Sequence, residues 1–147
     1  MEYYVMNINV VCPHCLNVSS VEKRESYTDE RCVACKASLL ECMPLKANAQ
    51  ILEHFIGSSE LPVIVDFWAP WCAPCLQMVE HFDKAAMAMP IEAQFLKVNN
   101  DSEQALSKKL HIARIPCVLV FKEGKEVDRF TGARSSKKIE QWVRQFI

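Results

Sequence analysis

The sequence lacks an excess of charge of either sign and lacks a long uninterrupted apolar run. Its 17 basic and 18 acidic residues leave a net charge of −1 and are mixed along the chain. A basic surface that would select nucleic acid or an anionic membrane is therefore not expected. The longest apolar run, LPVIVDFWAP, is interrupted by Asp66 and is too short to cross a bilayer. These absences argue against nucleic-acid-binding and membrane-spanning proteins.

The first residues, MEYYVMNINVV, also lack the basic start of a secretory signal, so we expect a cytoplasmic protein. At 147 residues, half of them apolar, the chain has the size of one domain, or of one domain with a small appendage. It contains eight cysteines. In a reducing compartment, paired cysteines are more often metal ligands or redox catalysts than structural disulfides.

Residues 1–45 are predicted to form a metal-binding extension. They show little helical periodicity, and they contain CPHC and CVAC separated by 16 residues, which is the spacing of a four-cysteine zinc site. Two tight turns would each present two thiolates, and together these complete the tetrahedron that zinc prefers. The expected ligands of one structural Zn²⁺ are Cys12, Cys15, Cys32 and Cys35. The alternative is a disulfide-linked or disordered tail.

Two residues near these ligands need their own interpretation. His14 lies between two ligands and could compete as one, but with four cysteines present we expect it beside the site or exposed. Cys42 lies outside both pairs and is expected to be a small buried hydrophobic residue. Because the extension is too short to bury much apolar surface, the metal should supply much of its stability. Residues 46–147 should stay folded without it.

Residues 46–147 alternate between strand and helix patterns, which predicts an α/β domain. Apolar runs predict strands over residues 63–68, 93–98, 115–121 and 126–132. Four helices are expected. The first begins after Asn48 and closes at Gly57, and the third covers residues 102–111. The second and fourth are amphipathic, with apolar stripes formed by Val79, Phe82, Ala86 and Met89 and by Ile139, Trp142, Val143, Phe146 and Ile147. A right-handed parallel crossover and a final antiparallel hairpin give a mixed central sheet with helices on both faces.

The third cysteine pair, Cys72 and Cys75 in FWAPWCAPC, lies where a strand ends and a helix begins. A helix N-terminus stabilises a thiolate and can lower a cysteine pKa to roughly 3.5–7.5. Pro74 fits the first helical turn and stiffens it. Trp68 and Trp71 supply an apolar rim for docking, local core, or both. This pattern indicates redox catalysis, since a third metal half-site would have no unassigned partner pair.

Three segments, VDFWAPWCAPC, KVNND and ARIPCVLVFKEG, together resemble the thioredoxin family over about residues 47–147. With the four-cysteine extension in front, the whole chain resembles the zinc-containing bacterial thioredoxin 2 type. The resemblance implies a thioredoxin fold and a disulfide reductase of cytosolic proteins, with no organic cofactor of its own. It also implies recycling by a thioredoxin reductase that uses flavin and NADPH.

The resemblance assigns the attacking thiol to Cys72 and the resolving thiol to Cys75. Asp66 matches the family's buried acid behind the resolving cysteine. The residues agree, because an acid inside VIVDFW is costly to bury as a charge, so its pKa should rise and it can move a proton for Cys75. A water-exposed Asp66 is the alternative. Lys97 matches a lysine near that acid, with simple surface exposure as its alternative.

The resemblance also implies a substrate groove. Pro116 matches a cis-proline that faces the dithiol, beside a backbone edge that pairs with an extended substrate. The expected groove residues are Trp71, Ala73, Pro74, Ile115, Pro116 and Gly132. Ala73 replaces a frequent glycine and should shift the redox potential modestly. Arg114 replaces a small residue beside the groove and could change substrate preference.

Cys117 stands where the family usually has threonine. Because it follows Pro116, we expect its side chain close to Cys72 and Cys75. It would then be either a buried threonine substitute with a raised pKa or a third redox thiol. For the whole chain, the alternative to a reductase is a zinc-ribbon module that recruits a partner, with the redox domain secondary.

Overall fold

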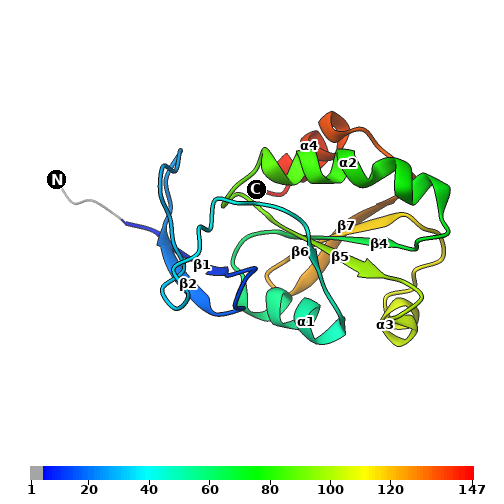
Figure 1. Cartoon of the computed structure of the whole chain (residues 1–147), viewed down its shortest axis with the longest axis horizontal. Coiled ribbons are helices and arrows are strands. Elements are labelled where there is room, and N and C mark those ends of the chain that lie inside the picture. The colour runs from blue at the N-terminus through cyan, green and yellow to red at the C-terminus, as the bar shows by residue number, and fades with distance from the viewer. Residues whose placement is uncertain (1–4) are drawn as a thin grey trace.

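The computed structural model describes residues 5–147, which form a small two-stranded sheet and a larger five-stranded sheet (Figure 1). Residues 1–4, the first part of the segment examined above for a secretory signal, lie outside the described residues. The small sheet consists of antiparallel β1 (Asn7–Val11) and β2 (Val18–Glu22). The large sheet has the order β3-β5-β4-β6-β7, formed by β3 (Leu45–Lys46), β4 (Val63–Trp68), β5 (Gln94–Asn99), β6 (Cys117–Lys122) and β7 (Lys125–Thr131).

The large sheet is mixed, as the sequence predicts. β3, β5 and β4 run parallel, whereas β6 pairs antiparallel with β4 and β7 pairs antiparallel with β6. Because β4 and β5 are parallel, their carboxyl ends meet at the same edge of the sheet. The segment that carries Cys72 leaves the sheet at this edge.

Helices cover both faces of the large sheet (Figure 1). The helices are α1 (Ala49–Ser58), α2 (Ala73–Met87), α3 (Gln104–Lys109) and α4 (Ser136–Arg144). α2 and α4 lie on one face, where Phe82 packs with Ile64 of β4. On the other face, Phe67 of β4 packs with Phe55 of α1. β4 is thus buried on both sides, which explains why all its residues except Asp66 are apolar.

Several element boundaries differ from the sequence expectations. Asn48 caps α1 as predicted, accepting the N–H of Ile51 at 2.8 Å, but Gly57 does not close the helix, which continues through Ser58. α3 is shorter than residues 102–111. The stripe of α4 excludes Ile147, which is 53% exposed. Finally, β1, β2 and β3 were not predicted, because the first two are short edge pairs and β3 has only two residues.

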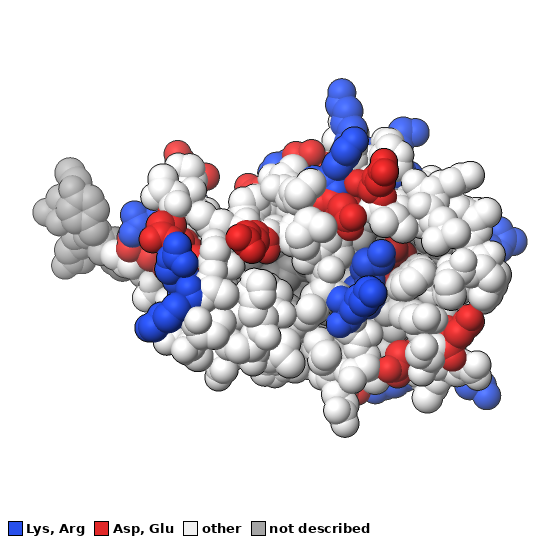
Figure 2. Space-filling model, viewed as in Figure 1, with Lys and Arg blue, Asp and Glu red and all other residues white. Residues whose placement is uncertain are grey.

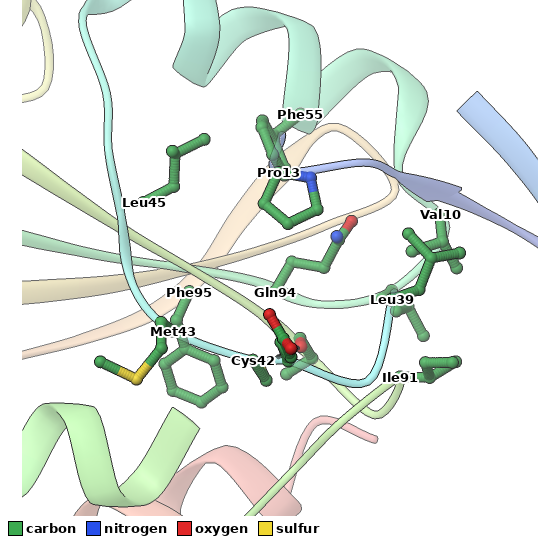
Figure 3. Close-up of a pocket in the computed structure, with 13 residues that line it drawn as sticks. Val10, Pro13, Leu39, Cys42, Met43, Leu45, Phe55, Ile91, Gln94 and Phe95 are labelled. Atoms are coloured by element: carbon green, nitrogen blue, oxygen red, sulfur yellow. Dashed lines mark hydrogen bonds between the residues drawn. The ribbon is translucent and has the colours of Figure 1, made fainter. Parts of the chain in front are cut away.

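The N-terminal part of the chain is packed against the five-stranded sheet. The side-chain amide of Gln94, at the start of β5, accepts the N–H of Val11 at 3.2 Å and donates to the Val11 carbonyl at 2.7 Å, both in a buried setting. The Val11 side chain belongs to the same core cluster as Leu52 and Phe55. Val10 lies beside Leu39 and Ile91 around a hollow at this junction (Figure 3).

Two further contacts join these parts. Asn9 and Glu60 exchange hydrogen bonds, with the Asn9 N–H donating to the Glu60 carboxylate at 2.8 Å and the Glu60 N–H donating to the Asn9 carbonyl at 2.9 Å. The His54 ring bonds the Leu16 carbonyl at 2.6 Å. The extension thus contributes Val11 to the core of residues 46–147, so the two parts share packing. That residues 46–147 stay folded without the extension stays a prediction.

Candidate redox site and metal cluster

Cys72 and Cys75 lie at the junction between β4 and α2. Cys72 is the N-cap residue of α2, its sulfur accepts the N–H of Cys75 at 3.3 Å, and Pro74 lies in the first turn. The two cysteines form a disulfide, with their Cα atoms 5.2 Å apart. Both are buried in a small cluster with Ala69, alongside the half-buried Trp68 and Ile115. A cysteine at a helix N-cap is suited to form a thiolate after reduction.

The predicted groove residues come together beside Cys72. The Ile115 carbonyl oxygen lies 3.8 Å from the Cys72 sulfur. The Ile115–Pro116 peptide is cis, as expected, and the Pro116 carbonyl accepts the N–H of Gly132 at 2.9 Å. Gly132 has φ +86°, a conformation that L side chains rarely adopt. The segment before β6 therefore lies beside the Cys72 sulfur, and the segment after β7 is hydrogen-bonded to the segment before β6.

The rim on the α2 side is apolar and open. Trp71 is 69% exposed, and its indole N–H donates to a carboxylate oxygen of Asp101 at 2.8 Å. Ala73 and Pro74 are exposed next to it, as is Leu76. Of the two roles considered for the tryptophans, Trp71 thus has the exposure needed for docking. Trp68 is half-buried and contributes to local packing.

Asp66 is buried, so its exposed alternative is wrong. The residue is 2% exposed, and its Oδ1 has no hydrogen-bond partner among the described residues. Burial raises the pKa of Asp66 from 3.8 to about 7, and the opposing charge of Lys97 lowers it by less. Lys97 is the register partner of Asp66 on β5, and its Nζ lies 5.0 Å from the centroid of the Trp68 ring. Lys97 is half-buried and not simply a surface residue.

The alternation of β4 directs Asp66 toward α2. Side chains two residues apart share a face of a strand, so Asp66 projects to the same side as Ile64. Ile64 packs against α2 residues Met78 and Phe82. Cys75 is buried in the first turn of that helix. The Asp66 carboxyl group thus lies on the face of the sheet that is covered by α2, the helix that carries Cys75.

Cys117 does not occupy the position expected for it. It pairs with Phe67 across β4 and β6, and directly opposed residues share a face. Its side chain therefore packs with Phe67 and Leu106 on the face covered by α1 and α3, not in the cluster of Cys72 and Cys75. It is 1% exposed, and burial raises its pKa, against an opposing effect of Arg129. The strand alternation explains the error, and the interpretation as a packed threonine substitute fits.

The four N-terminal cysteines form one cluster. The sulfur atoms of Cys12, Cys15, Cys32 and Cys35 all lie within 4.8 Å of one another. The Cys12–Cys35 and Cys15–Cys32 sulfur distances are 3.6 and 3.5 Å. A tetrahedral ion with sulfur ligands at about 2.3 Å requires sulfur atoms about 3.8 Å apart. The cluster can therefore hold a metal ion.

The two cysteine turns repeat one backbone pattern. In each turn the residue after the second cysteine has a positive φ, +68° at Leu16 and +66° at Lys36. Its N–H bonds the carbonyl of the first cysteine, at 2.8 Å in one turn and 3.0 Å in the other. The N–H two residues after that first cysteine, from His14 or Ala34, points at its sulfur at 3.4 Å. The two cysteine pairs therefore lie on matching turns, which the cysteine spacing alone did not predict.

Other polar groups tune the cluster. Hydrogen bonds from backbone N–H groups, that of Cys35 foremost, lower the pKa of Cys32 to about 6. Burial raises the pKa of Cys12 to about 12. The His14 side chain is exposed and is not part of the sulfur cluster, as expected. Cys42 is half-buried against the core, and its sulfur lies 3.8 Å from the Ala93 carbonyl.

The surface has mixed charge, and in the face shown in Figure 2 the basic and acidic side chains are interspersed. No helix among residues 5–147 has the length and apolarity to cross a membrane.

Comparison with known proteins gives consistent matches. The family model described as thioredoxin matches residues 43–145. Thioredoxin C-3 of Corynebacterium nephridii is 32% identical over 136 residues, which cover 92% of this chain and 93% of that protein. That match therefore extends into the four-cysteine region. Thioredoxin 1 of Synechococcus elongatus is 39% identical over 75 residues, or 51% of this chain and 70% of that protein.

Solved structures match the larger part of the chain. Chloroplastic thioredoxin z has a TM-score of 0.65 at 27% identity, covering 70% of this chain and 93% of its own. Plasmodium falciparum thioredoxin has a TM-score of 0.64 at 26% identity, covering 69% of this chain and 98% of its own.

Proposed function

Because this chain belongs to the thioredoxin family, we propose that it reduces disulfides in cytosolic proteins through Cys72 and Cys75, and that a flavin- and NADPH-dependent thioredoxin reductase recycles it. The family consists of protein-disulfide oxidoreductases, and this chain is one of them. The observation that carries the proposal is the Cys72–Cys75 pair at the N-cap of α2, beside an apolar rim. None of the other six cysteines forms a disulfide, which suits a reducing compartment.

In the proposed cycle, the Cys72 thiolate attacks one sulfur of a substrate disulfide. A bond forms between Cys72 and that sulfur, while the other substrate sulfur leaves as a thiolate and takes a proton. The Cys75 thiolate then attacks the Cys72 sulfur and releases the second substrate thiolate. Two electrons have passed to the substrate, and the Cys72–Cys75 disulfide remains for the reductase to reduce. The N-cap position of Cys72 supports its role as the attacking thiol.

Asp66 is proposed to accept the proton of Cys75 in the second step. Its burial on the face covered by α2 and its pKa of about 7 support this role, since a general base works best when its pKa is near the operating pH. Lys97, its register partner, is proposed to hold that pKa from rising further. The groove formed by Trp71, Ala73, Pro74, Ile115, Pro116 and Gly132 is proposed to bind the substrate chain.

We propose one structural zinc ion at Cys12, Cys15, Cys32 and Cys35, because four cysteine sulfurs at these separations suit zinc. The metal would hold the two cysteine turns together. The proposed division is a metal-binding extension, residues 1–45, and a redox domain, residues 46–147. The family match to residues 43–145 supports this division.

The test is insulin reduction with NADPH and thioredoxin reductase. The account expects turnover that requires both Cys72 and Cys75, measured as NADPH consumption and as precipitation of reduced insulin. A chain that consumes no NADPH with insulin, and whose Cys72→Ser variant behaves like the unaltered protein, would contradict the proposal. Such a result would favour the alternative role as a zinc-ribbon module that recruits a partner.

A further inference from the structure

Basic side chains lie on the segment beside the Cys72 sulfur and on a second segment that is hydrogen-bonded to the first. Arg114 immediately precedes Ile115, whose carbonyl is 3.8 Å from the Cys72 sulfur. Arg134 follows Gly132 by two residues, and Gly132 is bonded to the Pro116 carbonyl. Each of these two segments therefore carries an arginine, one before β6 and another after β7.

Neither arginine is neutralised within residues 5–147. Arg114 is exposed and forms no ion pair with any residue in that range. Arg134 also forms no ion pair there, and its guanidinium group lies 4.0 Å from the centroid of the Phe130 ring. That stacking fixes the position of the charge without cancelling it. By contrast, Arg129, which lies within β7, is paired with Glu126.

The positive charge continues away from the sulfur. Thr131, Ala133, Arg134, Ser135 and Lys138 line an open surface hollow next to Gly132. Lys138 is exposed and has no ion pair in the described part of the chain. On the opposite rim, the carboxylate of Asp101 is hydrogen-bonded to Trp71. Two arginines and a lysine thus occur on or directly after the segments that carry Ile115 and Gly132, whereas the opposite rim carries an acid.

We propose that Arg114 and Arg134 make this rim selective for protein disulfides whose cysteines have acidic neighbours. The inference rests on the proposed function and adds the substrate class. Complementary charge raises the rate of association and fixes the orientation of a partner more than it raises affinity. An exposed pair is worth up to about 1 kcal/mol, or about a fivefold difference in rate, and added salt weakens it.

The experiment compares three cyclic disulfide peptides that differ only in the residues beside the cysteines, which are Glu, Gln or Lys. The prereduced protein is mixed with each peptide, and the second-order rate constant is followed by tryptophan fluorescence at 20 and 500 mM NaCl. Acidic neighbours also change the intrinsic reactivity of a disulfide. Each rate is therefore divided by the rate of the same peptide with dithiothreitol.

The variants are Arg114→Gln, Arg134→Gln and the double variant. The matched control is Lys125→Gln, because Lys125 lies at the β6–β7 turn, at the other end of β6 from Cys117. We expect the corrected Glu/Lys rate ratio to be about tenfold at low salt in the unaltered protein and in the control. It should fall toward unity in the double variant and at high salt. Arg134→Lys should retain the ratio, which separates charge from packing on Phe130.

Equal corrected rates for the three peptides in the unaltered protein would overturn the inference and leave the proposed function intact. A corrected Glu/Lys rate ratio that is unchanged in the double variant would also overturn the inference and leave the proposed function intact. Failure to reduce any of the peptides would overturn the proposed function, and the inference with it.

Discussion

Replacing Asp66 by Asn tests the account of the buried acid, because it removes the ionisable group and keeps a similar side-chain shape. Burial raises the pKa of Asp66 from 3.8 to about 7 in the folded protein. An acid whose pKa is raised by folding favours the folded state only while it stays protonated. The native protein should therefore lose stability as the pH rises from about 4 to about 7, and the loss should level off above that range.

The size of this loss follows from the shift. Each pKa unit corresponds to about 1.4 kcal/mol, so a change from 3.8 to about 7 predicts a loss of about 4 kcal/mol. Asp66→Asn should not show it. The unpartnered amide adds an offset that does not depend on pH, so the informative quantity is how the difference between the two proteins changes with pH.

The assay is urea unfolding of the oxidised proteins at half-unit steps from pH 4 to pH 9. The free energy of unfolding of Asp66→Asn minus that of the native protein should rise by about 4 kcal/mol between pH 4 and pH 8. Parallel curves across this range would refute the reasoning, since they would mean that Asp66 titrates alike in the folded and unfolded chains. Asp83→Asn, the same chemical change at a half-buried α2 residue outside the buried core, is the matched control and should not alter the pH dependence.

Three further predictions follow from the same structure. Freshly reduced protein should contain about one zinc per chain. Chelation of the zinc should lower the free energy of unfolding of the whole chain by about 2–4 kcal/mol, because it disturbs the Val11 side chain and its two hydrogen bonds to Gln94. A melting temperature, followed by tryptophan fluorescence, that is the same before and after chelation would contradict this contribution of Val11. Alkylation of the reduced protein at neutral pH should label Cys72 before Cys75, and mass spectrometry showing the reverse order would reassign the two roles. After mild oxidation, disulfide mapping should find only the Cys72–Cys75 bridge, with equal inactivation rates for the native protein and Cys117→Thr; a disulfide that includes Cys117 would contradict its placement in the core.

The parts of the fold that sequence patterns predicted are those with strong local signals. VIVDFW is a strand because its five apolar residues around Asp66 suit burial on both faces. Asn48 caps α1 because its side chain accepts a backbone N–H that has no partner within the helix. The cysteine spacing predicted the cluster, because a tight turn brings two sulfurs to one side. These features depend on residues close together in the chain.

What the sequence did not reveal depends on contacts between distant residues. The double hydrogen bond between Gln94 and Val11 joins residues 83 positions apart, and neither residue carries a local signal for it. The placement of Cys117 failed for a related reason. Adjacency to Pro116 suggested proximity to the dithiol, but the pairing with Phe67 decides which face the side chain occupies.

The central claim, that Cys72 attacks substrates and Cys75 releases them, is tested most directly by trapping. Cys75→Ser should accumulate a mixed disulfide between Cys72 and a substrate cysteine, because the thiol that resolves it is missing. The measurement is the mass of the adduct formed with an oxidised peptide, with its attachment site found by digestion. The account predicts an adduct on Cys72 in the Cys75→Ser protein and no adduct on Cys75 in the Cys72→Ser protein. An adduct on Cys75 in the Cys72→Ser protein, with none on Cys72 in the Cys75→Ser protein, would contradict it.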